Sequence, residues 1–303
     1  MCTAIRFNEY FFGRTLDFER SFGEQMLVLP RETVGLMDCK SRYAMMGIGV
    51  LCDGGAMLFD GVNEWGLASA ALNFSGYACY GSVGGRADIG AGGLISLVLG
   101  LCRSVGEARE MLGGINITRD GQGSAPLHWM VSDGREAMVV EAVAEGIRLY
   151  DNPVGVLTNA PDFVYHMTRL GDIAHLSPAS RLADYSRGMG AIGLPGDFSS
   201  ASRFLRAAFI CRHGTMPDDT DLGVNIAFDI LSSLSVPRGC VITHGGEAAY
   251  TRYTSVINMS TPTYYLTTAT CRTVHRLRLT DRLINGSEIQ RLALCAEPHF
   301  VDM

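Results

Sequence analysis

The sequence is poor in charge for its length. Of its 303 residues only 18% are charged, and the formal net charge is −6. Lysine and arginine are scattered rather than gathered into a stripe, so we expect no surface that follows a phosphate backbone and no nucleic-acid partner. The 47% apolar content is enough to fill a sizeable core, which excludes an intrinsically disordered chain.

Long hydrophobic runs and targeting signals are also missing. The longest apolar run that suggests a span, residues 94–101, is far shorter than the ~20 residues that a membrane helix needs. The start of the chain has neither a basic segment leading into an apolar one nor a small-residue cleavage site. We therefore expect a cytoplasmic protein that does not act at a membrane.

The cysteines lack the spacing of a metal site. There are nine of them, an odd number, spread along the chain without a C-x-x-C pair and without metal-type spacing to histidine. We expect mostly buried thiols in a reducing compartment, and neither a metal nor another cofactor.

What the sequence does contain is a succession of strand-like, helix-like and again strand-like segments with no linker between them. This pattern predicts one domain over residues 1–303. Apolar runs bounded by turn residues predict strands, and apolar spacing of three to four residues predicts helices. The expected strands are 3–7, 10–18, 26–29, 44–52, 56–59, 67–72, 127–132, 136–143, 147–150, 154–157, 250–259, 263–268 and 273–279, and the expected helices are 93–103, 104–111, 163–173, 199–211 and 220–234.

Cys2 is the first candidate for chemistry. If Met1 is removed, with no longer propeptide to cut, Cys2 carries both a thiol and a free α-amino group. An ordinary thiol has a pKa of about 8.5 and an α-amino group one of about 7.7 to 8.0, so the amine is able to take the thiol proton near neutral pH. Cys2 alone would then supply nucleophile and base for amide hydrolysis. The alternative is a small buried apolar residue.

Two arginines and an aspartate are candidates for the surroundings of Cys2. Arg14 and Asp17 lie on a strand that pairs with the strand of Cys2, but residues three apart point to opposite faces. Both reach Cys2 only if the strand bends, and Gly13 is the place we expect for a bulge. Arg203 follows a helix start that Ser199 or Ser200 should cap, where a cation is unfavourable. It therefore faces a carboxylate, with Asp17 the natural partner, or serves a site, unless it is simply solvated.

Asn73 and Asn159 each end a predicted strand. Amide groups at strand ends are well placed to stabilise the oxyanion of a tetrahedral intermediate. The alternative is that both asparagines only form turns, their usual role. His128, beside Trp129 in an apolar strand, is interpreted as a core histidine with satisfied hydrogen bonds.

Six segments together resemble one known family. They are residues 1–5, 12–17, 63–74, 127–129, 157–161 and 193–204. In this order, and over residues 1 to about 270, they are similar to the choloylglycine hydrolase family, which contains bile salt hydrolases and penicillin V acylases.

The resemblance implies a fold and a set of roles. The family consists of N-terminal nucleophile hydrolases, amidohydrolases acting on linear amides, with an α+β fold: a four-layer αββα sandwich of two antiparallel sheets. They are usually homotetramers. The resemblance implies that Cys2 is the nucleophile and, through its amine, the base, and that Asp17 orients this amine. The remaining implied roles are pocket charge for Arg14 and Arg203, and oxyanion stabilisation for Asn73 and Asn159.

The resemblance also bears on the substrate. Penicillin V acylases often have tyrosine where this chain has Asn73, whereas bile salt hydrolases resemble it in having asparagine. We therefore expect a hydrolase of glycine- or taurine-conjugated bile salts, with the steroid facing the loops Phe18–Glu24 and Leu58–Val62. The alternatives are a penicillin V or N-acyl homoserine lactone acylase of the same fold, and a non-catalytic sterol-binding module. The segment from His175 to Gly188 is shorter than the family extension used in subunit assembly.

Overall fold

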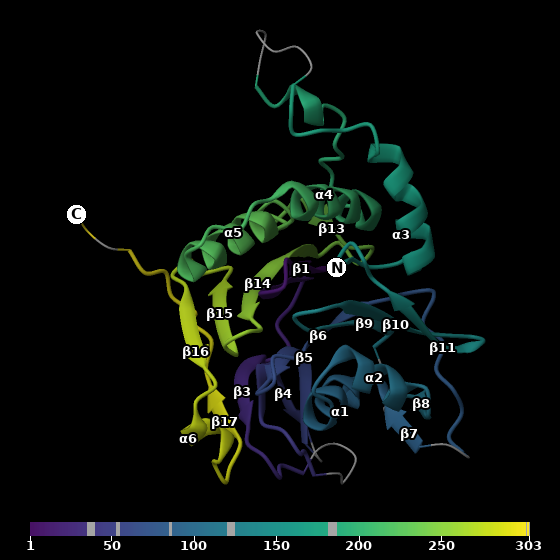
Figure 1. Ribbon diagram of the computed structural model, residues 1–303, viewed down its shortest axis with the longest axis vertical. Helices are drawn as coiled ribbons and strands as arrows, with labels where there is room; N and C mark the ends of the chain where they lie inside the picture. Colours follow the sequence, from purple (N-terminus) through teal and green to yellow (C-terminus); the bar gives the residue numbers. More distant parts are fainter. Residues whose placement is uncertain are drawn as a thin grey trace.

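Two antiparallel β-sheets lie face to face, and helices cover the outer face of each sheet (Figure 1). The computed structural model describes residues 1–34, 40–52, 55–84, 87–119, 125–180, 187–300 and 302. The predicted fold class, an αββα sandwich, is confirmed.

The first sheet has seven strands and contains the N-terminus. Its strand order is β12 (Val156–Leu157), β1 (Cys2–Phe7), β2 (Phe11–Phe18), β14 (Ala248–Asn258), β15 (Thr263–Thr268) and β16 (His275–Arg278), with β13 (Val241–Ile242) paired to β14.

The second sheet has eight strands and takes most of the first half of the chain. Its order is β11 (Gly146–Asp151), β10 (Ala137–Val143), β9 (Leu127–Ser132), β6 (Ala68–Asn73), β5 (Gly55–Asn63), β4 (Met45–Cys52), β3 (Gln25–Leu29) and β17 (Gln290–Leu292). The last strand comes from the C-terminal segment, so the tail of the chain crosses from the edge of the first sheet to the edge of the second.

Helices of opposite halves of the chain cover the two sheets. The first sheet is covered by α4 (Ser200–His213) and α5 (Thr220–Ser232), and the second by α1 (Leu94–Leu101) and α2 (Val105–Leu112). One buried apolar cluster fills the space between the sheets and under α4 and α5, and another lies under α1 and α2. The remaining elements are α3 (Phe163–Arg169), α6 (Asp281–Ile284), the parallel pair β7 (Ala87–Gly90) and β8 (Ile115–Thr118), and 3-10 turns at Ala91–Gly93, Leu170–Ile173 and Met189–Ala191.

Most predicted elements are confirmed to within a few residues, because their signals are local. Asn8, with φ of 51°, turns the chain between β1 and β2, and Ser104 and Ser199 cap α2 and α4. The short strands β7, β8, β13 and β17 and the helix α6 were not predicted. The tail strand has no apolar pattern of its own.

The predicted bulge at Gly13 is wrong. The pairing of β1 with β2 runs without a break, and the irregularity lies in β14 between Thr251 and Tyr253. Gly13 is needed for close packing instead, since a Cβ there would lie 2.8 Å from Leu231 of α5 and 2.8 Å from the Ser255 carbonyl.

Two further expectations concern cysteines and the projecting segment. The expectation of mostly buried thiols is wrong for the described cysteines, of which only Cys2, Cys102 and Cys271 are buried. Cys52, Cys79 and Cys240 are exposed. The described residues between α3 and α4, 170–180 and 187–199, project away from the two sheets (Figure 1). The expected shortened stretch from His175 to Gly188 lies partly outside the described residues, which omit 181–186. Within the described residues, no helix combines the length and the apolar character needed to span a bilayer.

Candidate functional site

Cys2 opens β1 and is 3% exposed. It pairs with Leu16 across the hairpin, and Met1 extends this pairing by one residue. The Met1 amino group donates to the Asp17 carbonyl at 2.6 Å, and the Asp17 amide donates to the Met1 carbonyl at 2.9 Å. The hairpin therefore holds the backbone on the N-terminal side of Cys2 in place.

Asn159 holds the nitrogen of Cys2. The Cys2 backbone N donates to Asn159 Oδ1 at 2.7 Å, while Asn159 Nδ2 donates to the Asn73 carbonyl at 2.8 Å. Asn159 can do this because β12 pairs with β1 and ends beside Cys2. Its own amide donates to Ser200 Oγ at 2.9 Å, at the start of α4. Its side chain therefore connects Cys2 with the end of β6, while its backbone is tied to α4.

Arg203 holds the carbonyl of Cys2. Its guanidinium donates to the Cys2 carbonyl, to Thr3 Oγ1 at 2.6 Å and to Asn159 Oδ1 at 2.8 Å. The side chain is fully buried, so the solvated alternative is wrong. Among the described residues it forms no ion pair with Asp17 either. Burial lowers the pKa of Arg203, and the charges of Asp17 and the Cys2 thiol partly offset this.

Asp17 lies fully buried on the same face of β2 as Gly13. Its carboxylate accepts hydrogen bonds from Thr251 Oγ1 at 2.5 Å and from Thr15 Oγ1 at 3.2 Å. These hydroxyls fix the orientation of the Asp17 carboxylate. Asp17 directly follows Leu16, the residue that pairs with Cys2. The predicted opposite orientation of Arg14 and Asp17 agrees with this geometry.

Arg14 points the other way, into the space between the sheets. Its Nη1 lies 3.5 Å from Asp60 Oδ2 and donates to the Phe59 carbonyl at 3.1 Å. Asp60 in turn accepts hydrogen bonds from the hydroxyls of Tyr253 and Tyr264. Burial alone would lower the pKa of Arg14, but Tyr253, the Cys2 thiol and Asp60 together raise it. Arg14 therefore keeps a positive charge near the nucleophile, and its buried Nη2 has no hydrogen-bond partner among the described residues.

Asn73 has a half-buried side chain at the end of β6. Its Oδ1 accepts from the Ser75 amide at 3.1 Å and from Ser75 Oγ at 2.7 Å, so it does form a turn. Its Nδ2 has no acceptor among the described residues and is free to bind a ligand. The turn alternative and the oxyanion hypothesis are therefore compatible for Asn73.

Two buried histidines lie close to these groups. His128 stacks on Phe74, with ring centroids 4.3 Å apart, and its Nε2 lies 2.9 Å from the Thr158 carbonyl, as expected of a satisfied core histidine. His166 was not predicted. Its Nε2 lies 2.8 Å from the Asn159 carbonyl, and burial lowers its pKa, so it supports Asn159 as a neutral ring.

The sequence missed the residues that support the site from a distance. Five of them carry no motif, and only the fold brings them to the site: Asp60, His166, Thr251, Tyr253 and Tyr264. Thr3 and Ser200 lie within the segments that resemble the family, but no role was predicted for them in the site. Around Cys2, the described residues form no group that could hold a metal ion.

An aromatic cluster extends from Arg14 to the surface. Phe59, whose carbonyl accepts from Arg14, packs edge-on against Phe22 at 5.5 Å, and Phe22 packs against Phe18 at 4.7 Å. Phe22 is 40% exposed. These residues belong to the two stretches predicted to face the substrate, and they form an apolar surface beside a buried cation. The expectation that Leu58–Val62 is a loop is wrong, because these residues lie within β5.

Asp197 stabilises the N-terminus of α4, the helix that carries Arg203. Asp197 Oδ1 accepts from the Ser199 amide at 2.8 Å and Oδ2 accepts from Ser202 Oγ at 2.6 Å. These hydrogen bonds lower the pKa of Asp197 to about 2. Because the folded-state pKa is depressed, the charge stabilises the protein above the usual pKa of 3.8, and this stability is lost as the pH falls towards 2.

We expect Asp197→Asn to reduce the free energy of unfolding at pH 6 by about 0.5 to 1 kcal/mol, because Asp197 is exposed to solvent. The difference in Tm from the unmodified protein should shrink as the pH is lowered from about 4 to about 2. Asp218→Asn, at another exposed aspartate, serves as the control. A Tm difference that is constant over this range would contradict the stabilising role of the Asp197 charge.

Comparison with known proteins identifies a family. Residues 2–291 match the model of the linear amide C–N hydrolases, choloylglycine hydrolase family. The chain is 34% identical over 320 residues to a bile salt hydrolase/transferase of Lactiplantibacillus plantarum, covering 99% of each chain. It is 32% identical over 315 residues to a conjugated bile acid hydrolase of Lactobacillus gasseri, covering 95% of this chain and 99% of the relative.

Solved structures agree with the fold. A variant of the conjugated bile acid hydrolase from Clostridium perfringens superposes with a TM-score of 0.90 at 28% identity, covering 99% of both chains. A penicillin V acylase from Agrobacterium tumefaciens gives a TM-score of 0.81 at 20% identity, covering 98% of this chain and 92% of that one. The second likeness concerns the fold alone.

Proposed function

Because the chain belongs to the choloylglycine hydrolase family of linear amide C–N hydrolases, we propose that it hydrolyses the amide bond of glycine- or taurine-conjugated bile salts. The observation that carries this proposal is the double fixation of Cys2. Its nitrogen is held by Asn159 Oδ1 at 2.7 Å and its carbonyl by Arg203. In a sheet these two backbone groups are usually satisfied by a neighbouring strand, whereas here the side chains of two distant segments bind them.

The active form in this proposal lacks Met1. An aminopeptidase that accepts the small side chain of Cys2 would convert its backbone amide into an amine, which remains beside Asn159 Oδ1. Removing Met1 also frees the Asp17 amide, which donates to the Met1 carbonyl. Asp17 then contributes a buried negative charge near the Cys2 amine. The neighbouring cation of Arg203 favours the neutral, basic form of this amine.

The reaction would proceed through a thioester. The Cys2 amine takes the thiol proton, Sγ attacks the amide carbonyl carbon, and the amine returns the proton to the nitrogen of the departing glycine or taurine. Water then attacks the thioester with the amine as base, which releases the bile acid and regenerates the thiol. In this proposal, Asn73 Nδ2 and the second hydrogen of Asn159 Nδ2, whose first is donated to the Asn73 carbonyl, stabilise the oxyanion of each tetrahedral intermediate.

The substrate is proposed from the relatives and from the surface beside Arg14. Relatives over the full length are named bile salt or conjugated bile acid hydrolases. Phe18, Phe22 and Phe59 offer an apolar surface for a steroid. The asparagine at position 73, where penicillin V acylases often have tyrosine, was the reason for preferring bile salts to penicillin V.

The homotetramer stays a prediction, to be measured by light scattering.

A panel of amides tests this assignment. We expect the processed protein to release glycine and taurine from glycocholate and taurocholate at least tenfold faster, in kcat/KM, than it cleaves penicillin V or an N-acyl homoserine lactone. A faster rate on either of the latter would reassign the substrate. Binding of cholate without turnover, unaffected by alkylation of Cys2, would indicate the sterol-binding module instead.

The aromatic surface provides a matched pair of variants for the same panel. Phe22→Ala should raise KM for glycocholate, because about 1 to 3 kcal/mol of apolar contact is lost. Trp65→Ala is the control, since Trp65 is also exposed but packs against Tyr43 and Arg103 instead. Equal KM values for the two variants would show that Phe22 does not contact the steroid.

A further inference from the structure

A metal-type spacing occurs twice near the C-terminus, contrary to the sequence-based expectation. Cys271-Arg272-Thr273-Val274-His275 and Cys295-Ala296-Glu297-Pro298-His299 both have the form C-x-x-x-H. Two cysteines and two histidines are the ligand set of many structural zinc sites. Each pair alone is unremarkable in sequence, and only the fold shows whether they meet.

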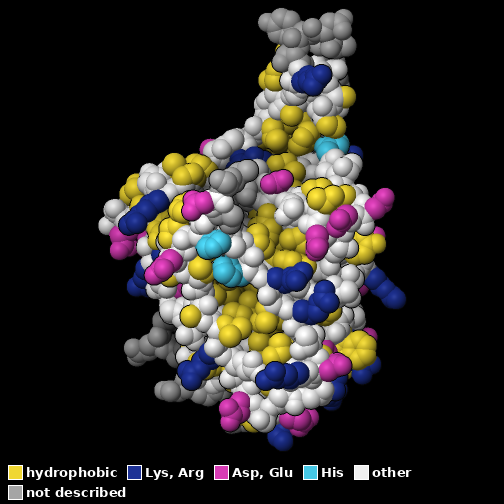
Figure 2. All heavy atoms as spheres, turned by 90° about the vertical axis from the view of Figure 1, so that its left-hand side faces the viewer, with side chains coloured by type: hydrophobic (Ala, Val, Ile, Leu, Met, Phe, Trp, Pro, Cys, Tyr) yellow, Lys and Arg dark blue, Asp and Glu magenta, His cyan; other side chains and the backbone are white. Residues whose placement is uncertain are grey.

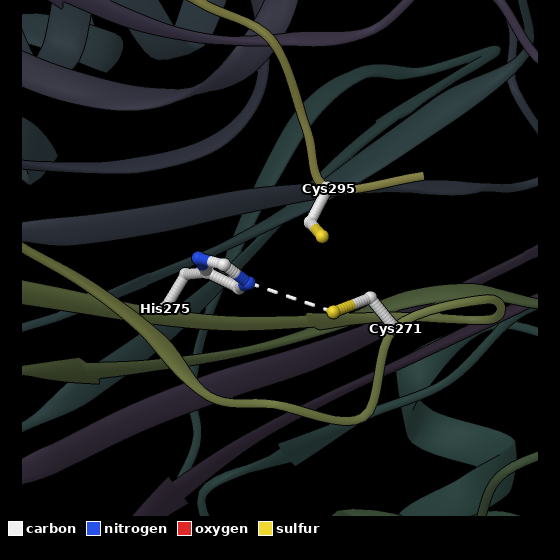
Figure 3. Close-up of side chains that lie close together, drawn as sticks. All are labelled: Cys271, His275 and Cys295. Atoms are coloured by element: carbon white, nitrogen blue, oxygen red, sulfur yellow. Dashed lines mark hydrogen bonds between the residues drawn. The ribbon is translucent and has the colours of Figure 1, made fainter. Parts of the chain in front are cut away.

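The fold brings three of the four side chains together. Cys271 Sγ lies 3.5 Å from His275 Nε2, and the ligand atoms of Cys271, His275 and Cys295 all lie within 4.8 Å of one another. Figure 3 shows the three side chains pointing towards a common space from two separate segments of the chain. The fourth residue, His299, is exposed and lies outside this group of three, but its Nδ1 lies 3.4 Å from Thr273 Oγ1 in the loop between Cys271 and His275.

The backbone around this cluster is held by hydrogen bonds. The Thr268 amide donates to the Cys271 carbonyl at 2.9 Å, and the Cys271 amide donates to Thr268 Oγ1 at 2.9 Å. Thr268 Oγ1 also donates to the Cys295 carbonyl at 2.8 Å. One threonine at the end of β15 thus positions both cysteines before any ion binds.

The cluster lies where the two sheets meet at one edge of the molecule. His275 begins β16 of the first sheet, and Cys295 follows β17, which pairs with β3 of the second sheet. A cavity of ≈ 250 Å³ separates these elements and is lined by Met26, Tyr264, Leu266, His275, Leu292 and Cys295, among others. On this edge, Figure 2 shows hydrophobic side chains gathered around two histidine side chains that are adjacent in this view.

We propose that Cys271, His275, Cys295 and His299 bind one Zn²⁺ ion, which fastens the C-terminal segment to the edge of the first sheet. Thiolates and imidazoles are the ligands that Zn²⁺ prefers, whereas Mg²⁺ and Ca²⁺ require oxygen. The site is structural and lies apart from Cys2. It therefore stands independently of the proposed function.

The charges of the four side chains suit a divalent ion. Binding would release the protons of both thiols to solvent, and the two thiolates would neutralise the charge of the ion.

Zinc uptake by the reduced, chelator-treated protein tests the proposal. The Cys2→Ala variant is used throughout, so that the N-terminal thiol cannot bind the ion. We expect one Zn²⁺ per chain by equilibrium dialysis, and Co²⁺ in its place should give thiolate charge-transfer and tetrahedral d–d absorption. Cys271→Ser combined with Cys295→Ser should lose both signals. Cys52→Ser combined with Cys240→Ser, at exposed cysteines elsewhere, should keep them.

A second measurement covers the case in which the cysteine variants fold poorly. In the protein with both cysteines intact, Zn²⁺ should slow alkylation of Cys271 and Cys295 but not of Cys240, and should slow tryptic cleavage after Arg291 in β17. Failure to take up Zn²⁺, or uptake that survives Cys271→Ser with Cys295→Ser, would overturn the proposal. So would a Cys271–Cys295 disulfide whose reduction restores no zinc binding. A tetrahedral Co²⁺ spectrum that persists in His299→Ala would remove His299 from the ligand set.

Discussion

Replacing Cys2 with serine is expected to reduce kcat/KM for glycocholate by roughly 10³-fold or more. The α-amine has a pKa of about 7.7 to 8.0, close to that of a thiol, whereas a serine hydroxyl is far less acidic and is therefore a much poorer nucleophile with the same base. The substitution exchanges one atom at a site that is 3% exposed, so the Tm should hardly change. Cys240→Ser, at an exposed cysteine, should keep full activity. An undiminished rate in Cys2→Ser would refute the mechanism.

The same mechanism requires that Cys2 be the terminal residue. Any extension left in front of Cys2 keeps its nitrogen an amide, which cannot act as a base. We therefore expect a protein with a blocked N-terminus to be inactive, and cleavage immediately before Cys2 to restore the rate. Intact-mass measurement shows which form is present. Full activity in a protein whose mass includes Met1 would rule out the amine as the base.

Replacing Arg203 with methionine is expected to lower kcat/KM for glycocholate by about 10²- to 10³-fold. The guanidinium is the donor that holds the Cys2 carbonyl, Thr3 Oγ1 and Asn159 Oδ1, and methionine leaves all three without it. Losing these buried hydrogen bonds should also destabilise the fold by about 1 to 3 kcal/mol. Activity must therefore be compared with stability.

Arg206 on the same helix separates the two effects. It is also largely buried, but it donates to the carbonyls of Pro195, Asp197 and Ser233 and has no hydrogen bond to Cys2. Arg206→Met should therefore lower the Tm. It should leave kcat/KM of the folded protein within about threefold of the unmodified value, because no contact to Cys2 is lost. Equal losses of activity in both variants, in proportion to lost stability, would reduce Arg203 to a structural role.

The pH dependence gives a readout that a structural role would not change. A positive charge near the Cys2 amine disfavours its protonated form. Removing Arg203 should therefore raise the pKa of the amine and move the acidic limb of kcat/KM to higher pH. Arg206→Met should leave this limb where it is. An acidic limb unaffected by Arg203→Met would argue against an electrostatic influence on the amine.

Local signals account for what could be predicted of the fold. The β1–β2 hairpin follows from apolar runs around Asn8, and the start of α4 follows from Ser199, because turns and caps depend on neighbouring residues. The sandwich of two antiparallel sheets was inferred from the family resemblance, not from these patterns. Gly13 shows where local patterns mislead. A glycine is needed there because Leu231 of α5 packs against it, and not because β2 bends.

The candidate site was predicted in its members but not in its contacts. All six predicted residues lie at or near the β1–β2 hairpin and its neighbours: Cys2, Arg14, Asp17, Asn73, Asn159 and Arg203. Their catalytic roles stay predictions. The Asp17–Arg203 ion pair, one of the alternatives left open for Arg203, is absent among the described residues. The sequence also left open which atoms of Asn159 are used, and here Oδ1 faces Cys2 while Nδ2 faces Asn73.

By itself the sequence determined that a small nucleophile stands at position 2 and that arginines and asparagines of the right types follow at strand and helix ends. Only the tertiary structure decided what they touch. Arg203 reaches the Cys2 carbonyl across 201 residues of chain, and Cys271 meets Cys295 from a different segment. Such contacts depend on how sheets and helices pack, because burying apolar faces brings together backbone segments whose sequences carry no record of one another.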